Sequence, residues 1–309
     1  MAAVGILFLA HDGVANPGVW ESWLASDPSV DVRFFVFCNE SVRHGRAFVE
    51  RHDLGVRCPT AWGTSSIVRA TVLCYRKIYD GFPEVAVVYL VSGSCVPLQP
   101  PRFFFERSAP GSFYYDFRPF SSLVQYVPAG PVKRNPLWSR GPRWPLLRRH
   151  LRCHLQWCAL SREHVRAVVE FPGLDWLYEE GDRVREVWCP DEWVLGTVLS
   201  LCGARGVRDR PTTDHVRERF EDEHPVTWSS WRVPRRFYEP WEDREVVCSL
   251  ARRVAEARGH GYLFFRKVGV QPRLTFDGGV LALQTSAMMG ERQRCMYPSE
   301  AMVYLISKG

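Results

Sequence analysis

Two adjacent carboxylates follow a proline and precede an apolar run in the segment WCPDEWVLGTVL, residues 188–199. A proline at the first helical position with acids in the first turn is ordinary helix-start chemistry, because the free N–H groups there favour negative charge. A carboxylate on such a turn can also act as a general base that takes a proton from a hydroxyl group. Asp191 and Glu192 therefore have two interpretations, a helix start and a catalytic base.

The composition predicts a folded chain with a large core. The protein has 309 residues, of which 46% are hydrophobic, enough for one large domain or two closely packed halves. The formal net charge of +6 suits an anionic ligand such as a nucleotide. It falls short of the charge density expected of a dedicated DNA-binding protein.

The N-terminal segment MAAVGILFLAHDG has a short apolar centre with no Lys or Arg before it, so we predict a buried strand rather than a secretory signal. Later apolar runs are too short to span a bilayer. We therefore expect a soluble chain, in the cytoplasm of a microbe or in a viral setting. The 10 cysteines include no C-x-x-C pair, which favours free thiols over disulfides or a zinc site.

The first hundred residues alternate between strand and helix patterns. Apolar runs typical of buried strands occupy residues 4–10, 32–38 and 85–91. Asn16-Pro17 marks a helix start between the first two runs, and residues 64–80 have capping hydroxyls followed by an apolar stripe at helical spacing. The pattern predicts an α/β fold with a mostly parallel central sheet whose ligand lies beyond the carboxyl ends of the strands.

Composition changes after Asp116, because no acidic residue occurs again until Glu163. This basic excursion is rich in Pro, Gly and Trp, and its long irregular pattern fits either a functional loop or a solvated surface. Regular patterns then return. Helices are predicted at 160–171, from Pro190 to about Cys202 and at 245–258, a strand is predicted at 261–270, and residues 271–309 have strand-like pieces without a motif.

Several short segments together resemble one enzyme family, in the family's own order and over residues 4–270. They are ILFLA, AWGTSSIVRATVLCYRKI, VVYLVSGSCVPLQPPRFF, LRCHLQWCALSREHV, CPDEWVLGTVL, HPVTWSSW and YLFFRKV. The sequence resembles the core-2/I-branching N-acetylglucosaminyltransferases and peptide-O-xylosyltransferases of glycosyltransferase family 14. The resemblance implies a single GT-A-like, Rossmann-like domain over residues 1–309, with a nucleotide-sugar-binding half (1–125) and an acceptor-binding and catalytic half (126–309).

The resemblance also implies an activity. Members invert the anomeric centre while moving N-acetylglucosamine or xylose from a UDP-sugar to a hydroxyl of a glycan or glycoprotein. The second carboxylate of the family's Pro-Asp-Glu motif is its catalytic base, and the equivalent here is Glu192. Members work without a metal, and the absence of an Asp-x-Asp motif from this sequence agrees with that expectation. We therefore expect no metal or other cofactor.

Positive side chains take the place of the metal in this family. The resemblance assigns the diphosphate to Arg244 and Lys267, with Arg266 as the alternative cation. Each could instead be a solvated surface charge.

The remaining candidates follow from strand ends and from the family's segments. For the uridine and ribose they are Ala10, His11, Asn39 and Ser66, and for the acceptor they are Arg152, Ser92, Gly93, Ser94, Trp228 and Ser230. A tryptophan beside small polar groups suits the apolar faces and hydroxyls of a sugar.

The sequence departs from the family at Arg69, where many members carry an acid, and at Ser230, which replaces Asp or Tyr. We also expect neither the membrane anchor nor the disulfides of animal members. These departures concern the identity of the acceptor more than the chemistry. Two alternatives stay open: an inactive glycan- or nucleotide-binding module of the same fold, and a nucleic-acid-binding protein that uses the basic excursion. Under the favoured interpretation no nucleic acid partner is expected.

Overall fold

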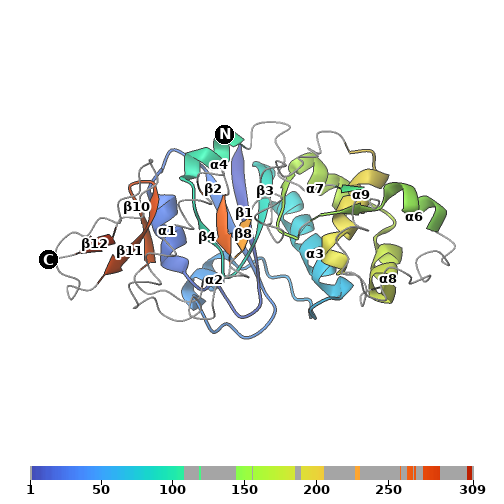
Figure 1. Ribbon diagram of the computed structural model, residues 1–309, viewed down its shortest axis with the longest axis horizontal. Coiled ribbons are helices and arrows are strands. Elements are labelled where there is room, and N and C mark those ends of the chain that lie inside the picture. Colours follow the sequence, from blue (N-terminus) through green and yellow to red (C-terminus); the bar gives the residue numbers. More distant parts are fainter. Residues whose placement is uncertain are drawn as a thin grey trace, which may run out of the picture.

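The computed structural model describes residues 2–107, 118–119, 144–154, 156–184, 189–204, 227–229, 258, 263–266, 268, 274–285 and 305–307. Its central sheet has the order β2-β1-β3-β7 (Figure 1). The strands are β1 (Ala3–Ala10), β2 (Val32–Cys38), β3 (Val85–Ser92) and β7 (Ala159–Ser161). β1 pairs in parallel with β2 and β3, while β7 runs antiparallel to β3. The chain is thus mixed α/β with a mostly parallel central sheet, as the sequence predicts.

Both faces of this sheet are buried, because β1 sends alternate side chains into two hydrophobic clusters. Ile6 and Phe8 pack toward α1 (Pro17–Ala25), which contributes Trp20 and Trp23. Leu7 packs on the opposite face, among residues of α3 (Ser65–Gly81), α7 (Arg162–Val169) and α9 (Val194–Leu201). Figure 1 shows α1 on one side of the strands and these three helices on the other. Continuous apolar runs are expected of strands that are covered twice.

Local capping explains where the covering helices begin and end. Thr64 precedes α3, and its Oγ1 accepts a hydrogen bond from the N–H of Ser66. At the other end of α3, the guanidinium of Arg162 donates to the carbonyls of Tyr79 and Phe82 at 2.7 and 3.1 Å. Ser161 caps α7 in the same way, because its hydroxyl accepts from the N–H of His164.

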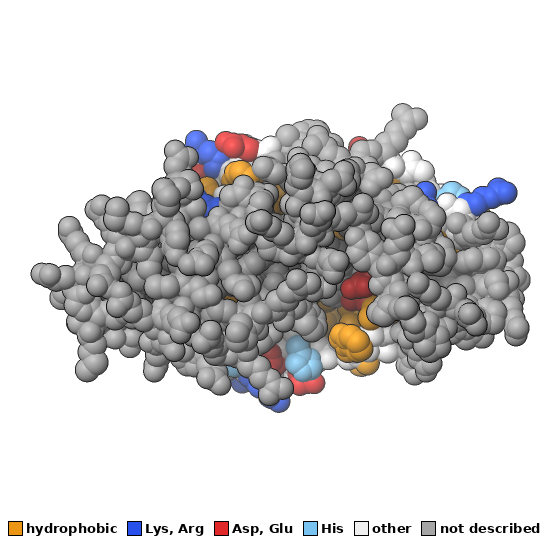
Figure 2. Space-filling model, in the orientation of Figure 1, with side chains coloured by type: hydrophobic (Ala, Val, Ile, Leu, Met, Phe, Trp, Pro, Cys, Tyr) orange, Lys and Arg blue, Asp and Glu red, His pale blue; other side chains and the backbone are white. Residues whose placement is uncertain are grey.

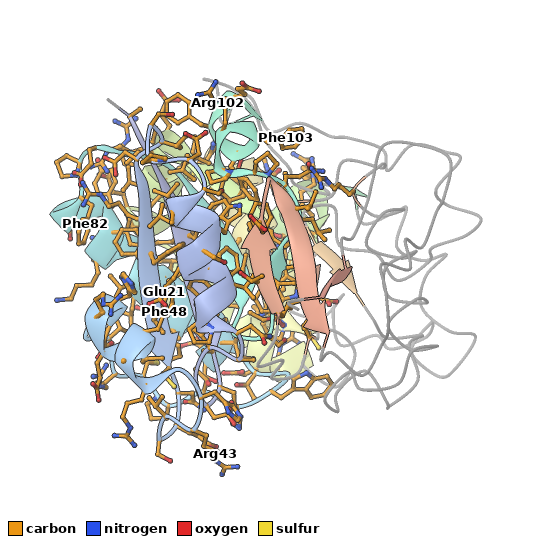
Figure 3. The ribbon with its side chains drawn as sticks, turned by 90° about the vertical axis from the view of Figure 1, so that its left-hand side faces the viewer. Glu21, Arg43, Phe48, Phe82, Arg102 and Phe103 are labelled. Atoms are coloured by element: carbon orange, nitrogen blue, oxygen red, sulfur yellow. The ribbon has the colours of Figure 1, made fainter. Side chains whose placement is uncertain are left out.

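Two smaller three-stranded sheets lie against this core. β10 (Leu274–Asp277), β11 (Val280–Thr285) and β12 (Leu305–Ser307) form one sheet, in which β10 and β11 are antiparallel and β12 is parallel to β11. Figure 3 shows this sheet beside α1, where the Ser22 hydroxyl accepts from the N–H of Phe276 at 2.9 Å. The other sheet has the order β4-β9-β8, with β4 (Val96–Pro97), β9 (Phe264–Arg266) and β8 (Thr227–Ser229).

The remaining described elements complete the fold. They are α2 (Arg46–His52), α4 (Pro101–Arg107), the pair β5 (Arg118–Pro119) and β6 (Arg152–Cys153), α6 (Trp144–His150), α8 (Leu174–Val184) and a single 3-10 turn, η3 (Pro190–Glu192). None of the helices in the described part of the chain is both long and apolar enough to cross a bilayer.

The continuous helix predicted from Pro190 to Cys202 is wrong. The chain forms η3, leaves helical geometry at Trp193 (φ −149°, ψ −25°), and begins α9 at Val194. Trp193 is fully buried, so packing of its indole in the core overrides continuation of the helix. The helix predicted at 245–258 falls outside the described residues except for Arg258, which is helical.

Candidate functional site

The carboxyl ends of β1, β2 and β3 meet at one edge of the sheet. Ala10 lies opposite Cys38, and Leu9 lies opposite Ser92. The turns beyond these strands are joined by backbone hydrogen bonds, from Asn39 N–H to the Ala10 carbonyl (3.1 Å) and from Glu40 N–H to the His11 carbonyl (2.9 Å). The structure therefore brings the predicted nucleotide residues Ala10, His11 and Asn39 together with the predicted acceptor loop that begins at Ser92.

Glycine is required at position 93 because two turns touch there. A Cβ atom on Gly93 would lie 2.2 Å from the carbonyl oxygen of Gly13 and 3.1 Å from the Cβ of Ala10. The carbonyl of Gly93 in turn accepts from the N–H of Ala15 at 2.8 Å. The Ser-Gly-Ser loop is thus packed directly against the turn that follows β1, and a side chain larger than hydrogen would separate them.

The start of α3 is tied to the same edge by the side chain of Asn39. Its amide accepts from the N–H of Thr60 at 2.9 Å and donates to the Thr60 carbonyl at 3.3 Å. The predicted residue Ser66 lies on the first turn of α3, where its hydroxyl accepts from the N–H of Ala61 at 2.9 Å. Both side chains therefore shape the loop over the sheet edge.

Charged side chains line this edge. His11 Nε2 lies 3.4 Å from a Glu40 carboxylate oxygen, with both side chains largely in solvent, and His44 lies 3.9 Å from Asp12. Figure 3 shows Arg43 at the end of the molecule opposite Arg102 of α4. The backbone N–H of Arg43 donates to the Asp12 carbonyl at 2.7 Å. The lower edge of Figure 2 accordingly shows histidine, acidic and hydrophobic side chains beside one another.

Glu192 also lies on the carboxyl side of the sheet. β7 is antiparallel to β3, with Ala159 opposite Tyr89, so the chain before β7 lies beyond the end of β3. Within that chain, the N–H of His154 donates to the Glu192 carbonyl at 2.8 Å. The turn η3, with its two acids, is thereby held beside the segment that leads into β7.

A second set of contacts joins η3 to the start of α3. Gly181 of α8 packs so closely on Pro190 that an added Cβ would lie 3.1 Å from the proline ring. The next residue, Asp182, accepts from the N–H of Ser65 at 2.8 Å and from its hydroxyl at 2.6 Å. α8 therefore connects the Pro-Asp-Glu turn to the helix start that Asn39 ties to β2.

Electrostatics at the turn reflect its two acids. Burial, followed by the negative charges of Asp191 and Glu192, raises the pKa of the Cys189 thiol to about 11. Cys38, at the end of β2, also has its pKa raised, chiefly by burial. Neither thiol is therefore activated as a nucleophile.

Arg152 lies on β6, where its N–H donates to the Thr197 hydroxyl at 3.2 Å. Its guanidinium donates to the carbonyls of Arg149 and Leu151. These contacts give Arg152 a part in holding α6 beside α9, in addition to the acceptor contact predicted from the sequence.

Several predicted residues lie wholly or partly outside the described part of the chain. Lys267, Arg244 and Ser230 do so entirely, whereas Arg266 and Trp228 are described in their backbone alone. In that backbone, Arg266 is opposite Ser229. The N–H of Val268 donates to the Ser94 carbonyl at 3.0 Å, so the chain just after Lys267 is joined to the Ser-Gly-Ser loop.

Two residues near the site were not among the predicted site residues. Asp182 had no signal in the sequence, because its partner Ser65 is 117 positions away. Trp62 belongs to the segment AWGTSSIVRATVLCYRKI that resembles the enzyme family, but no role was assigned to it, and it is 88% exposed.

Comparison with known proteins found no match, either to a family model or to a curated protein. Within the described residues, no group of three or more His, Cys, Asp or Glu side chains is arranged to hold a metal ion.

Proposed function

We propose that the protein is a GT-A-like inverting glycosyltransferase that moves N-acetylglucosamine, or xylose, from a UDP-sugar to a hydroxyl of a glycan or glycoprotein without a metal. The acceptor oxygen attacks the anomeric carbon, its proton passes to the Glu192 carboxylate, and the bond between that carbon and the β-phosphate oxygen breaks. UDP leaves from the opposite side, so the configuration inverts.

The observation that carries the proposal is the position of η3. The carbonyl of Glu192 is bonded to His154 beyond the end of β3, and Pro190 packs on α8, which is bonded to the start of α3. In open α/β sheets, ligands bind beyond the carboxyl ends of the strands. The backbone of Glu192 is fixed at that edge, which supports its assignment as the general base.

Lys267 and Arg244 are proposed to stabilise the negative charge on the departing diphosphate, with Arg266 as the alternative cation. The bond from Val268 N–H to the Ser94 carbonyl supports the assignment of Lys267, because it joins the neighbouring chain to the carboxyl edge. A guanidinium or ammonium at a departing diphosphate supplies the stabilisation that other transferases obtain from a divalent ion.

The binding roles divide along the edge. Ala10, His11, Asn39 and Ser66 are proposed for the uridine and ribose. The acceptor is assigned to the Ser92–Ser94 loop, which packs against the same turn as Ala10, and to Arg152, Trp228 and Ser230. Donor and acceptor would then meet across the Gly13–Gly93 contact.

The test is to incubate the purified protein with a panel of UDP-sugars and a mixed glycan acceptor, with and without EDTA, and to follow transfer by mass spectrometry. We expect transfer from one donor, unaffected by EDTA. Lys267→Ala should lower kcat strongly, whereas Lys267→Arg should retain part of it. Transfer that requires manganese would contradict the assignment of the leaving-group charge to these side chains.

A further inference from the structure

Trp62 stands out among the described tryptophans because its side chain is 88% exposed, whereas Trp20, Trp23 and Trp193 are fully buried. An exposed apolar residue by itself is common on protein surfaces. The loop that carries this one distinguishes it.

The loop is held by hydrogen bonds on both sides of the indole. Before Trp62, Thr60 is bonded twice to the Asn39 amide. The N–H of Ala61 donates to the Ser66 hydroxyl, and the Ala61 carbonyl accepts from the N–H and the hydroxyl of Thr64 at 3.2 and 2.9 Å. After Trp62, Gly63 has a φ of +73°, a conformation that favours glycine. The indole is therefore carried by a fixed turn, so little backbone conformational entropy remains to be lost when a ligand contacts it.

The location of the turn indicates which kind of ligand would contact Trp62. Asn39 is the first residue after β2, and its N–H is bonded to the last residue of β1. The turn that carries Trp62 thus lies where the first two parallel strands and the next helix start converge, the position at which open α/β sheets bind nucleotides. The flat base of a nucleotide offers a π-face that stacks on an aromatic side chain without needing a particular hydrogen-bond pattern.

We propose that Trp62 is the stacking face for the pyrimidine base of the nucleotide donor, an inference that rests on the proposed function. The base lies flat on the indole, while the ribose and phosphates extend along the carboxyl edge toward the Ser-Gly-Ser loop. Trp62 is then a binding residue whose removal weakens affinity for the nucleoside part and leaves the diphosphate contacts intact.

The experiment measures binding of UDP, UMP and inorganic pyrophosphate to the full chain by calorimetry. Trp62→Ala should weaken the affinity for UDP and for UMP by about 5- to 150-fold, the range that corresponds to loss of one stacked base. The affinity for pyrophosphate should not change. Trp62→Phe should recover most of the loss. Phe105→Ala is the matched control, because Phe105 is also a partly exposed aromatic (39%) but lies on α4, away from this edge. All variants should melt within a few degrees of the wild type.

The outcomes separate this inference from the proposed function. If the wild type binds UDP and Trp62→Ala binds it equally well, the stacking role is overturned. The proposed transferase function is not affected by that result. A Trp62→Ala variant that binds UDP normally but has a raised KM for the acceptor also overturns it, because the indole would then contact the acceptor sugar. Failure of the wild type to bind UDP or UMP overturns both. UDP binding that depends on Trp62 without sugar transfer supports the stacking role and contradicts the transferase.

Discussion

The bonds between Asp182 and Ser65 offer a test of how the site is assembled. Ser65 is the first residue of α3, so its N–H is one of the helix-start donors without a partner in the helix itself. Asp182 of α8 accepts from this N–H at 2.8 Å and from the buried Ser65 hydroxyl at 2.6 Å. Asp182→Ala removes both acceptors and the negative charge at the helix start.

The size of the effect follows from those contacts. A hydrogen bond to a charged group contributes about 1.5–3 kcal/mol to stability, and an acid at a helix N-terminus adds about 0.3–1 kcal/mol. Asp182 is exposed, so hydrogen bonds to water offset part of the stabilisation that the substitution removes. We expect Asp182→Ala to lower the free energy of unfolding by about 1.5–2.5 kcal/mol, which corresponds to a fall in Tm of roughly 2–4 °C for a chain of 309 residues.

The assay is urea unfolding of the wild type, Asp182→Ala, Ser65→Ala and the double variant. Ser65→Ala keeps the backbone N–H but loses the hydroxyl, so the two changes share one bond. The double variant should be less destabilised than the sum of the single variants by about 0.5–1.5 kcal/mol. Two results would contradict this account of the connection between α8 and α3. One is a free energy of unfolding for Asp182→Ala within about 0.5 kcal/mol of the wild type, and the other is additive destabilisation by the two substitutions.

Three further predictions concern other described residues. Gly93→Ala should separate the two turns at the sheet edge and destabilise the protein by about 2 kcal/mol or more, as measured by thermal unfolding; a wild-type Tm would contradict the close contact. Burial, then the charge of Arg51, lowers the pKa of His52 below its ordinary value of 6.5, so the unfolded chain binds that proton more readily and stability should fall as the pH drops below about 6.5. His52→Gln should reduce this slope in urea titrations at pH 5 to 7, and an unchanged slope would exclude His52 as its source. Burial raises the pKa of Cys74 and of Cys158 to about 12, so iodoacetamide should label exposed Cys202 before this buried pair, which it should reach only in urea; peptide mapping that finds equal rates for Cys202 and the pair would show that the pair is accessible.

The sheet could be predicted from the sequence because its signals are local. The runs at residues 4–10, 32–38 and 85–91 are continuously apolar, as expected of strands covered on both faces, and they form β1, β2 and β3. Their order in the chain then places the strand-end residues on one edge, so Ala10 and Asn39 could be grouped before the structure was known.

The rest depends on contacts between distant segments. The break at Trp193 could not be predicted, because it depends on where the indole is buried rather than on helix propensity. The Asp182–Ser65 bonds and the Asn39–Thr60 bonds each join residues far apart in sequence, and no spacing rule indicates them. The proximity of Lys267 to Glu192 and the identities of donor and acceptor stay predictions.

The most direct test of the central claim is the turnover number of Glu192→Gln against that of Asp191→Asn, measured with saturating UDP-sugar and acceptor in EDTA. If Glu192 removes the acceptor proton, Glu192→Gln should lower kcat by about 10²- to 10⁴-fold with UDP affinity and Tm unchanged. Asp191→Asn should retain most activity, because the proposed base is Glu192 and not Asp191. Equal activity of Glu192→Gln and the wild type would contradict the account.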